Sequence, residues 1–211
     1  MSERGLFAAI LAAVCLFAGL AVAQDEKNEV SAVVGRTFLS KQAIQGASFF
    51  DPFIRFGDGL SFEGGYSRRV ILRQIYSVSG EVMALYNPDE DLHSGGPGLV
   101  PKDYSALFVT PGVRVNLFPT TSVSPWGSVG GGFGHITQNG VTIYGAPNTG
   151  KATTSGVMQF GFGLDVKLKT HLLIRGEARD YWAGEPDFPA ASTGKTRQHN
   201  FFAGGGVIWR F

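Results

Sequence analysis

The sequence predicts an all-β fold in which eight antiparallel strands close into a barrel. Three observations support this prediction. Apolar and polar residues alternate along short runs rich in glycine and aromatic residues, and the connections between the runs are alternately short and long. The chain also ends with Val207, Trp209 and Phe211 at every second position. Such alternation is the pattern of a strand with one apolar face, and this composition is typical of β-barrels.

The composition restricts the class of protein. The chain has 211 residues, a formal net charge of +1, 44% hydrophobic residues and 30 glycines. This length fits one domain. A nucleic-acid binder would need a basic surface, and a disordered chain would be less apolar. We therefore expect one folded domain that binds no nucleic acid.

The first residues predict a cleavable signal peptide. Arg4 precedes an apolar run, and Ala21-Val22-Ala23 matches the A-x-A site that signal peptidase reads. We expect a signal peptide at 1–23 and a mature barrel domain at 24–211. Because the one cysteine, Cys15, lies in the signal, the mature chain is expected to form no disulfide and no cysteine-bound metal site.

Eight runs after the signal read as strands. Within one of them, Val78 and Val82 alternate with Ser79 and Glu81, so that one face is apolar and the other polar. No run is long enough for a spanning helix, so any entry into a membrane is by strands. The predicted strands are Glu29–Phe38, Leu60–Arg69, Ile71–Tyr86, Leu107–Leu117, Val123–Thr137, Val157–Leu168, Leu172–Trp182 and His199–Phe211.

The connections between these strands are sorted by length. Short ones are expected near 69–71, at 118–122 and at 168–171, and long ones at 39–59, 87–103, 138–155 and 183–197. Transmembrane barrels have short periplasmic turns and long extracellular loops. The sorting therefore predicts a transmembrane barrel with both termini on the periplasmic side. A water-soluble sheet with solvent-facing charges is the alternative, and it leaves the sorting unexplained.

The polar faces of the strands predict a charged interior. A transmembrane barrel turns its apolar row to lipid, and an eight-stranded barrel is only wide enough for side chains to fill. Because an unpaired buried charge costs several kcal/mol, we expect the interior charges to pair and to form a plug rather than an open channel. The predicted interior charges are Glu63, Glu81, Arg114, Arg175, Glu177 and Arg179.

Residues 24–211 resemble the small outer-membrane β-barrel proteins of Gram-negative bacteria, the superfamily that includes outer membrane proteins A, X and W. In this family the last residue is typically Phe with apolar residues at alternate positions before it, as at Phe211, Trp209 and Val207, whereas Gly205 departs from the pattern. The glycine-aromatic runs GGFG (131–134) and FGFG (160–163) are also similar.

The resemblance implies a place in the outer membrane of a Gram-negative bacterium. It also implies insertion by the barrel-assembly machinery, which reads the row Val207, Trp209 and Phe211. The partners it implies are outer-membrane lipid and lipopolysaccharide, and we expect a monomer. Cations of the long connections are expected near the lipopolysaccharide phosphates. These cations are Lys102, Lys151, Lys195 and Arg197.

The sequence predicts no catalytic, cofactor or metal site. Residues 145–152 approach a phosphate-binding loop, but Ala152 stands where that loop needs Ser or Thr. The acidic run 87–91 lacks the spacing of a calcium loop. His135, with Thr137 nearby, comes nearest to a hydrolase site, but no carboxylate is placed to complete it.

These observations predict a non-enzymatic structural barrel whose surface loops serve recognition or adhesion. Two alternatives remain open at this point. One is a narrow pore or a carrier for small hydrophobic molecules, and the other is a lipid A-modifying hydrolase that uses His135.

Overall fold

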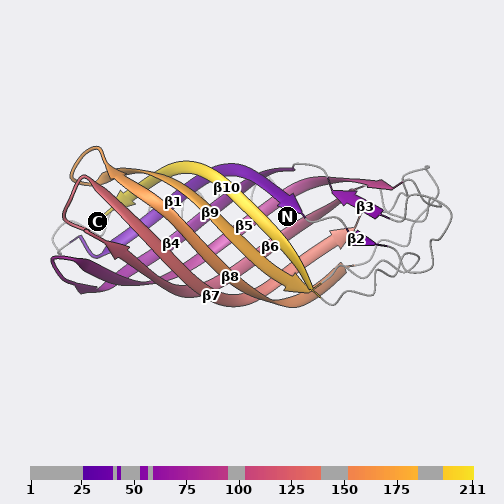
Figure 1. Cartoon of the computed structure of the whole chain (residues 1–211), viewed down its shortest axis with the longest axis horizontal. Helices are drawn as coiled ribbons and strands as arrows, with labels where there is room; N and C mark the ends of the chain where they lie inside the picture. Colours follow the sequence, from indigo (N-terminus) through magenta and orange to yellow (C-terminus); the bar gives the residue numbers. More distant parts are fainter. Residues whose placement is uncertain are drawn as a thin grey trace, which may run out of the picture.

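A computed structural model describes residues 26–39, 42–43, 53–56, 59–94, 103–138, 152–184 and 197–211. The expected signal peptide at 1–23 lies outside these residues. Long tilted strands form one elongated barrel (Figure 1). Within the described ranges, no helix has the length and apolar character needed to cross a membrane.

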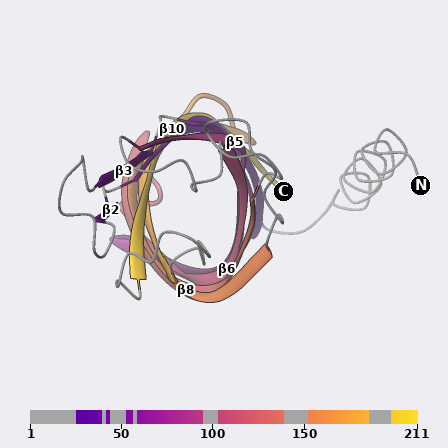
Figure 2. The same ribbon diagram turned by 90° about the vertical axis from the view of Figure 1, so that its right-hand side faces the viewer.

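Eight strands form the barrel, and each pairs antiparallel with both of its neighbours. The pairing of the first strand with the last closes the ring that Figure 2 shows along the barrel axis. The predicted eight-stranded antiparallel barrel is thus confirmed. The strands are β1 (Asn28–Leu39), β4 (Gly59–Leu72), β5 (Tyr76–Ser94), β6 (Asp103–Leu117), β7 (Val123–Gln138), β8 (Ala152–Lys167), β9 (Leu172–Gly184) and β10 (Arg197–Arg210).

Two short strands that the sequence did not predict extend the sheet at the end with the long connections. β2 (Gln42–Ala43) pairs with β3 (Phe53–Phe56), and β3 pairs with the last residues of β5. Both lie inside the long connection expected at 39–59. Part of that connection therefore has strand structure of its own, next to the barrel mouth (Figure 1).

The predicted turns at 118–122 and 168–171 fall between strands as expected, but several other boundaries were wrong, among them the start of β6, which lies at Asp103 and not at Leu107. β4 continues to Leu72, so the turn lies at 73–75 rather than near 69–71, and Ile71 belongs to β4. β5 continues through the acidic run 87–91, which is strand and not loop. β8 begins at Ala152, five residues before its predicted start. These boundaries were missed because apolar and polar residues no longer alternate regularly in these segments, although the backbone still pairs with the neighbouring strand.

The outer face of the barrel is apolar. Phe162 is 70% exposed, and Val34, Phe62 and Val129 are about half exposed. Arg36 is also exposed, in phase with Val34, so the first strand keeps its alternation despite this charge. A continuous apolar outer face with a buried polar row is the reverse of a water-soluble barrel, and it is the arrangement of a barrel that faces lipid.

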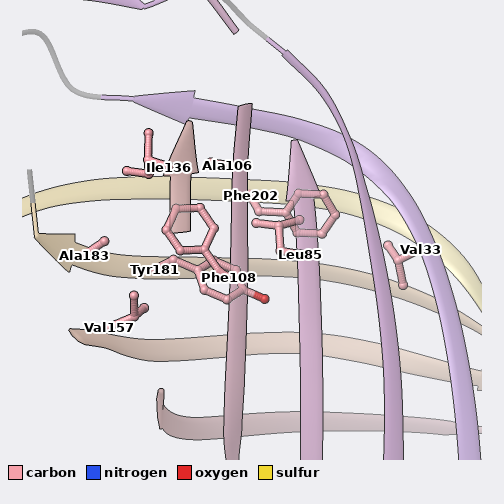
Figure 3. Close-up of a cluster of buried hydrophobic side chains, with 9 residues drawn as sticks. All are labelled: Val33, Leu85, Ala106, Phe108, Ile136, Val157, Tyr181, Ala183 and Phe202. Atoms are coloured by element: carbon pink, nitrogen blue, oxygen red, sulfur yellow. The ribbon is translucent and has the colours of Figure 1, made fainter. Parts of the chain in front are cut away.

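The interior has two layers along the barrel axis. The charged side chains lie in the part nearer the short turns, and a cluster of apolar side chains lies in the part nearer the long connections (Figure 3). The Phe108 and Tyr181 rings stack in this cluster with centroids 5.4 Å apart. The polar faces of the strands predicted an interior plugged by charges, and this apolar layer was not predicted. Its residues are Val33, Leu85, Ala106, Phe108, Ile136, Val157, Tyr181, Ala183 and Phe202.

Two glycines of the glycine-aromatic runs make room for interior rings. A Cβ atom on Gly134 would lie 2.7 Å from Cδ1 of Phe108, and one on Gly163 would lie 2.7 Å from Cζ2 of Trp126. Each glycine is paired with that aromatic residue on the neighbouring strand. The runs GGFG and FGFG thus place a glycine beside a large ring in a narrow barrel.

Candidate functional site

The six charged residues predicted for the interior all lie buried inside the barrel. None of their exposed fractions is above 7%. Three further charged residues, Glu29, Asp165 and Arg210, lie there with them. Among the described residues, the interior therefore holds five carboxylates and four guanidinium groups. We call these nine residues the lumen charge network: Glu29, Glu63, Glu81, Arg114, Asp165, Arg175, Glu177, Arg179 and Arg210.

Arg179 on β9 is the centre of the first part of the network. Its guanidinium group faces three carboxylates at once. The Nη1 atom lies 3.0 Å from Oε1 of Glu81, Nε lies 3.2 Å from Oε1 of Glu63, and Nη2 lies 3.2 Å from Oε2 of Glu177. These contacts join β9 to β4 and β5 on the other side of the barrel, so Arg179 bridges the interior.

Asp165 on β8 is the centre of the second part. Its two carboxylate oxygens each accept a hydrogen bond from Arg175, from Nε and from Nη2, both at 2.8 Å. Trp126 Nε1 donates to Asp165 at 3.1 Å, and Asn116 Nδ2 donates at 3.2 Å. The carboxylate thus binds arginine in the two-bond geometry that makes such pairs strong, with neutral donors completing its contacts.

Glu29 on β1 is the centre of the third part, at the seam where the ring closes. It accepts hydrogen bonds from Arg114 on β6, from Ser67 at 3.1 Å and from Arg210 on β10, whose Nη2 lies 2.6 Å from Oε1. A longer contact of 3.9 Å from Arg114 to Glu81 links this part to the Arg179 part.

A tryptophan ring lies among the arginines of the network. The guanidinium carbons of Arg175, Arg179 and Arg114 lie 4.7, 4.9 and 5.9 Å from the Trp126 ring centroid. A cation over an aromatic face is attracted by the negative charge density of the ring. Trp126 therefore stabilises three neighbouring cations of the network.

Tyr181 joins the two layers of the interior. Its ring packs in the apolar layer, and its hydroxyl donates to Oε2 of Glu63 at 2.6 Å. The polar contacts thus run from the seam through Arg179 to the base of the apolar layer. Such an arrangement can tie the strands together across the barrel and fill its interior.

Three network residues, Glu29, Asp165 and Arg210, were not predicted, although they follow the same alternation as the other six. Asp165 lies in the polar row opposite Leu164 and Val166, and Arg210 alternates with the outward residue Trp209. Glu29 is in phase with Ser31 on the buried face of β1. All three lie within the predicted strands, where a period of two places them on the inner face.

The row at the end of the chain faces outward. Val207 and Trp209 are each 51% exposed on the outer surface of β10. Backbone hydrogen bonds of 2.8 Å in both directions between Phe211 and Asn28 hold the last residue against the first strand. The structure thus gives the position of this row, and its reading by the assembly machinery stays a prediction.

His135 lies on the outer surface and not in the interior. Its Nδ1 atom lies 2.8 Å from the Thr154 hydroxyl on β8, and the ring is exposed. Thr137 is exposed on the same face two residues along β7. In the ranges that the structure describes, no group of three His, Cys, Asp or Glu side chains could hold a metal ion. Of the expected loop cations, Lys102, Lys151 and Lys195 lie outside those ranges.

Comparison with known proteins identifies the fold. Neither a protein-family profile nor a curated protein sequence matches this chain. Among solved structures, Neisserial surface protein A (NspA) is similar with a TM-score of 0.53 and 10% identity, over 87% of this chain and 97% of that one. OprG from Pseudomonas aeruginosa is similar with a TM-score of 0.52 and 11% identity, over 88% of this chain and 95% of that one. The N-terminal β-barrel domain of Pseudomonas aeruginosa OprF is similar with a TM-score of 0.50 and 12% identity, over 89% of this chain and 100% of that one.

These similar structures are small outer-membrane β-barrels, and at such identities the likeness concerns the fold. This chain therefore has the eight-stranded barrel fold of small outer-membrane proteins, as its last strand and its sorted connections predict.

Proposed function

We propose that this chain is an integral outer-membrane protein of a Gram-negative bacterium, with a structural barrel that carries surface loops for recognition or adhesion. One observation carries the proposal: large apolar side chains cover the outside of the barrel, while nine charged residues are buried and paired inside. This arrangement is stable in a lipid bilayer, where closed barrels satisfy every strand edge.

Two observations favour a structural barrel over a pore. The lumen charge network is buried in the interior near the short turns, and the apolar layer is buried in the interior near the long connections. Water and ions would have to displace both layers. A carrier of small hydrophobic molecules would need the apolar layer to open, yet Phe108, Leu85 and Tyr181 are each at most 1% exposed.

The hydrolase alternative is less well supported. Nucleophilic catalysis needs a base, a nucleophile and an orienting group within hydrogen-bond reach. Within the described residues, the contact of His135 is with the Thr154 hydroxyl on the lipid-facing side. We therefore propose a non-enzymatic barrel.

Two measurements test the proposed function. After separation of membranes by density, the protein should be in the outer-membrane fraction, and only detergent should extract it from that fraction. The purified protein in planar bilayers should show at most weak and intermittent current. Recovery as a stable soluble monomer would contradict the membrane placement, and a large steady current would identify a porin instead.

A further inference from the structure

A row of stacked side chains lies on the outer surface where β9 ends and β10 begins. Arg197 lies over the Trp182 ring at 4.7 Å, Trp182 stacks on His199 at 5.9 Å, and His199 stacks on Phe201 at 5.6 Å with 7° between the ring planes. The Asp180 carboxylate lies 2.7 Å from Nδ1 of His199. We call Arg197, Trp182, His199 and Asp180 the outer-rim patch.

The register places this patch at one edge of the apolar band. Trp209 is paired with Leu172 near the short turns, and His199 is paired with Trp182 ten residues further along both strands (209 − 199 and 182 − 172). At about 3.3 Å per residue and a strand tilt of about 40°, ten residues rise about 25 Å, the height of the lipid-facing band in such barrels. The two pairs thus mark its two edges.

A second histidine-tryptophan pair marks the opposite edge. His171 and Trp209 have ring centroids 5.8 Å apart. His171 Nδ1 lies 3.0 Å from the Arg210 carbonyl oxygen and 3.6 Å from Glu26. Aromatic residues at both edges are expected of any transmembrane barrel. What distinguishes the outer-rim patch is an arginine held against its tryptophan by stacking.

The side chains of this row become more polar along the barrel axis toward the long connections. Phe201 faces the level of acyl chains, His199 and Trp182 lie at the edge, and Arg197 lies two residues beyond it, on the side of the long connections. Stacking fixes the plane of the Arg197 guanidinium group, and a stacked guanidinium group presents its N–H edge to an anion. Asp180 orients the imidazole, so that Nε2 points away from the carboxylate. His199 is 49% exposed and Asp180 only 19%.

We propose that the outer-rim patch binds the phosphate-bearing headgroup of an outer-leaflet lipid, with Arg197 holding the phosphate and His199 as the second contact. This proposal rests on the proposed function, which places the long connections outside the cell. A lipid fits better than free phosphate because the cation and the acyl-level ring belong to one continuous row. Guanidinium groups bind phosphate through two parallel hydrogen bonds, which a lysine does not reproduce.

The test uses the full mature chain in nanodiscs of phosphatidylcholine that contain a small fraction of bisphosphorylated lipid A. Native mass spectrometry then counts the lipid A that stays bound to each barrel. Arg197→Gln should weaken retention at least fivefold, His199→Gln should weaken it less, and Arg197→Lys should restore only part of it. Arg68→Gln and His171→Gln change an exposed arginine and a stacked histidine at the opposite edge, so they should leave retention within twofold of wild type.

Three results would overturn the proposal. They are unchanged retention in Arg197→Gln, equal retention of lipid A from which both phosphates are removed, and displacement of the lipid by millimolar inorganic phosphate. The heat-dependent gel shift of each variant reports whether the barrel is folded and inserted. A folded barrel with unchanged retention contradicts this proposal alone, whereas failure of the wild type to insert contradicts the proposed function.

Discussion

Arg210, the last residue of β10, donates to Glu29 near the start of β1, with Nη2 2.6 Å from Oε1. The two residues are 181 positions apart in the sequence, and their contact crosses the seam that closes the barrel. Arg114 binds the other oxygen of the same carboxylate from β6. One buried side chain therefore holds the closing strands and the far wall together.

Glu29→Gln should destabilise the folded barrel, because it removes the nearest counter-charge of two buried guanidinium groups, Arg114 and Arg210. The expected loss is about 3–5 kcal/mol, measured by urea unfolding in detergent micelles. Glu26→Gln is the matched control, since Glu26 is 31% exposed and contacts His171 at the rim. An exposed pair of this kind contributes at most about 1 kcal/mol. Equal losses of unfolding free energy in the two variants would show that the buried seam contact stabilises the barrel no more than an exposed pair does.

Arg179→Met should destabilise the barrel through the opposite imbalance. It leaves Glu63, Glu81 and Glu177 facing one another without their shared cation. We expect a loss of about 3–5 kcal/mol in the same unfolding measurement. Adding Glu81→Gln to Arg179→Met should recover part of that loss, because it removes one of the repelling charges. Additive losses in the double variant would contradict the network as described.

Opening the apolar layer should raise ion conductance. Phe108→Ala together with Phe202→Ala removes two rings that fill the interior near the long connections (Figure 3). Single-channel current in planar bilayers should rise well above the wild-type level. Phe160→Ala, which changes an exposed ring on the outer face, should leave the current unchanged. If the interior variant also stays closed, the charge network alone seals the barrel.

Changing Trp209 and Phe211 to Ser should leave export intact and reduce insertion. The change removes apolar side chains from the outer surface of the closing strand, whereas the backbone pairing of β10 with β1 needs neither side chain. The measurement is the amount of heat-modifiable protein in the outer membrane. Phe201→Ser, higher on the same strand and face, is the control. Wild-type amounts of the double variant would refute the role of the terminal row.

Gly163→Ala should destabilise the barrel, because the new Cβ would lie 2.7 Å from Cζ2 of Trp126 and against the Gly176 carbonyl oxygen. Overpacking of this kind typically costs about 1–3 kcal/mol. Gly64→Ala is the control, since a Cβ there has nothing within 4 Å. The midpoint of thermal unfolding, followed by gel shift, separates the two. No difference between them would mean that β8 moves aside freely.

The sequence by itself determined the number of barrel strands, the face of each strand and the alternation of short and long connections. These features are local: a period of two assigns each side chain to one face, and a break in the pattern marks a turn, as at 118–122 and 168–171. The same periodicity placed Glu63, Arg114 and Arg179 on the inner face. It did not determine the turn at 73–75, because alternation fades near the strand ends.

Only the tertiary structure decided which residues of the inner face meet. Arg179 contacts Glu81, 98 positions away, because the tilt and stagger of the closed ring bring them to the same height. The inner face of β5 also carries Leu85, only four residues from Glu81, and these residues lie in different layers of the interior. Periodicity assigns both to one face, and it contains no information on height. The division into a charged part and an apolar part therefore follows from strand register, which is set when the barrel closes.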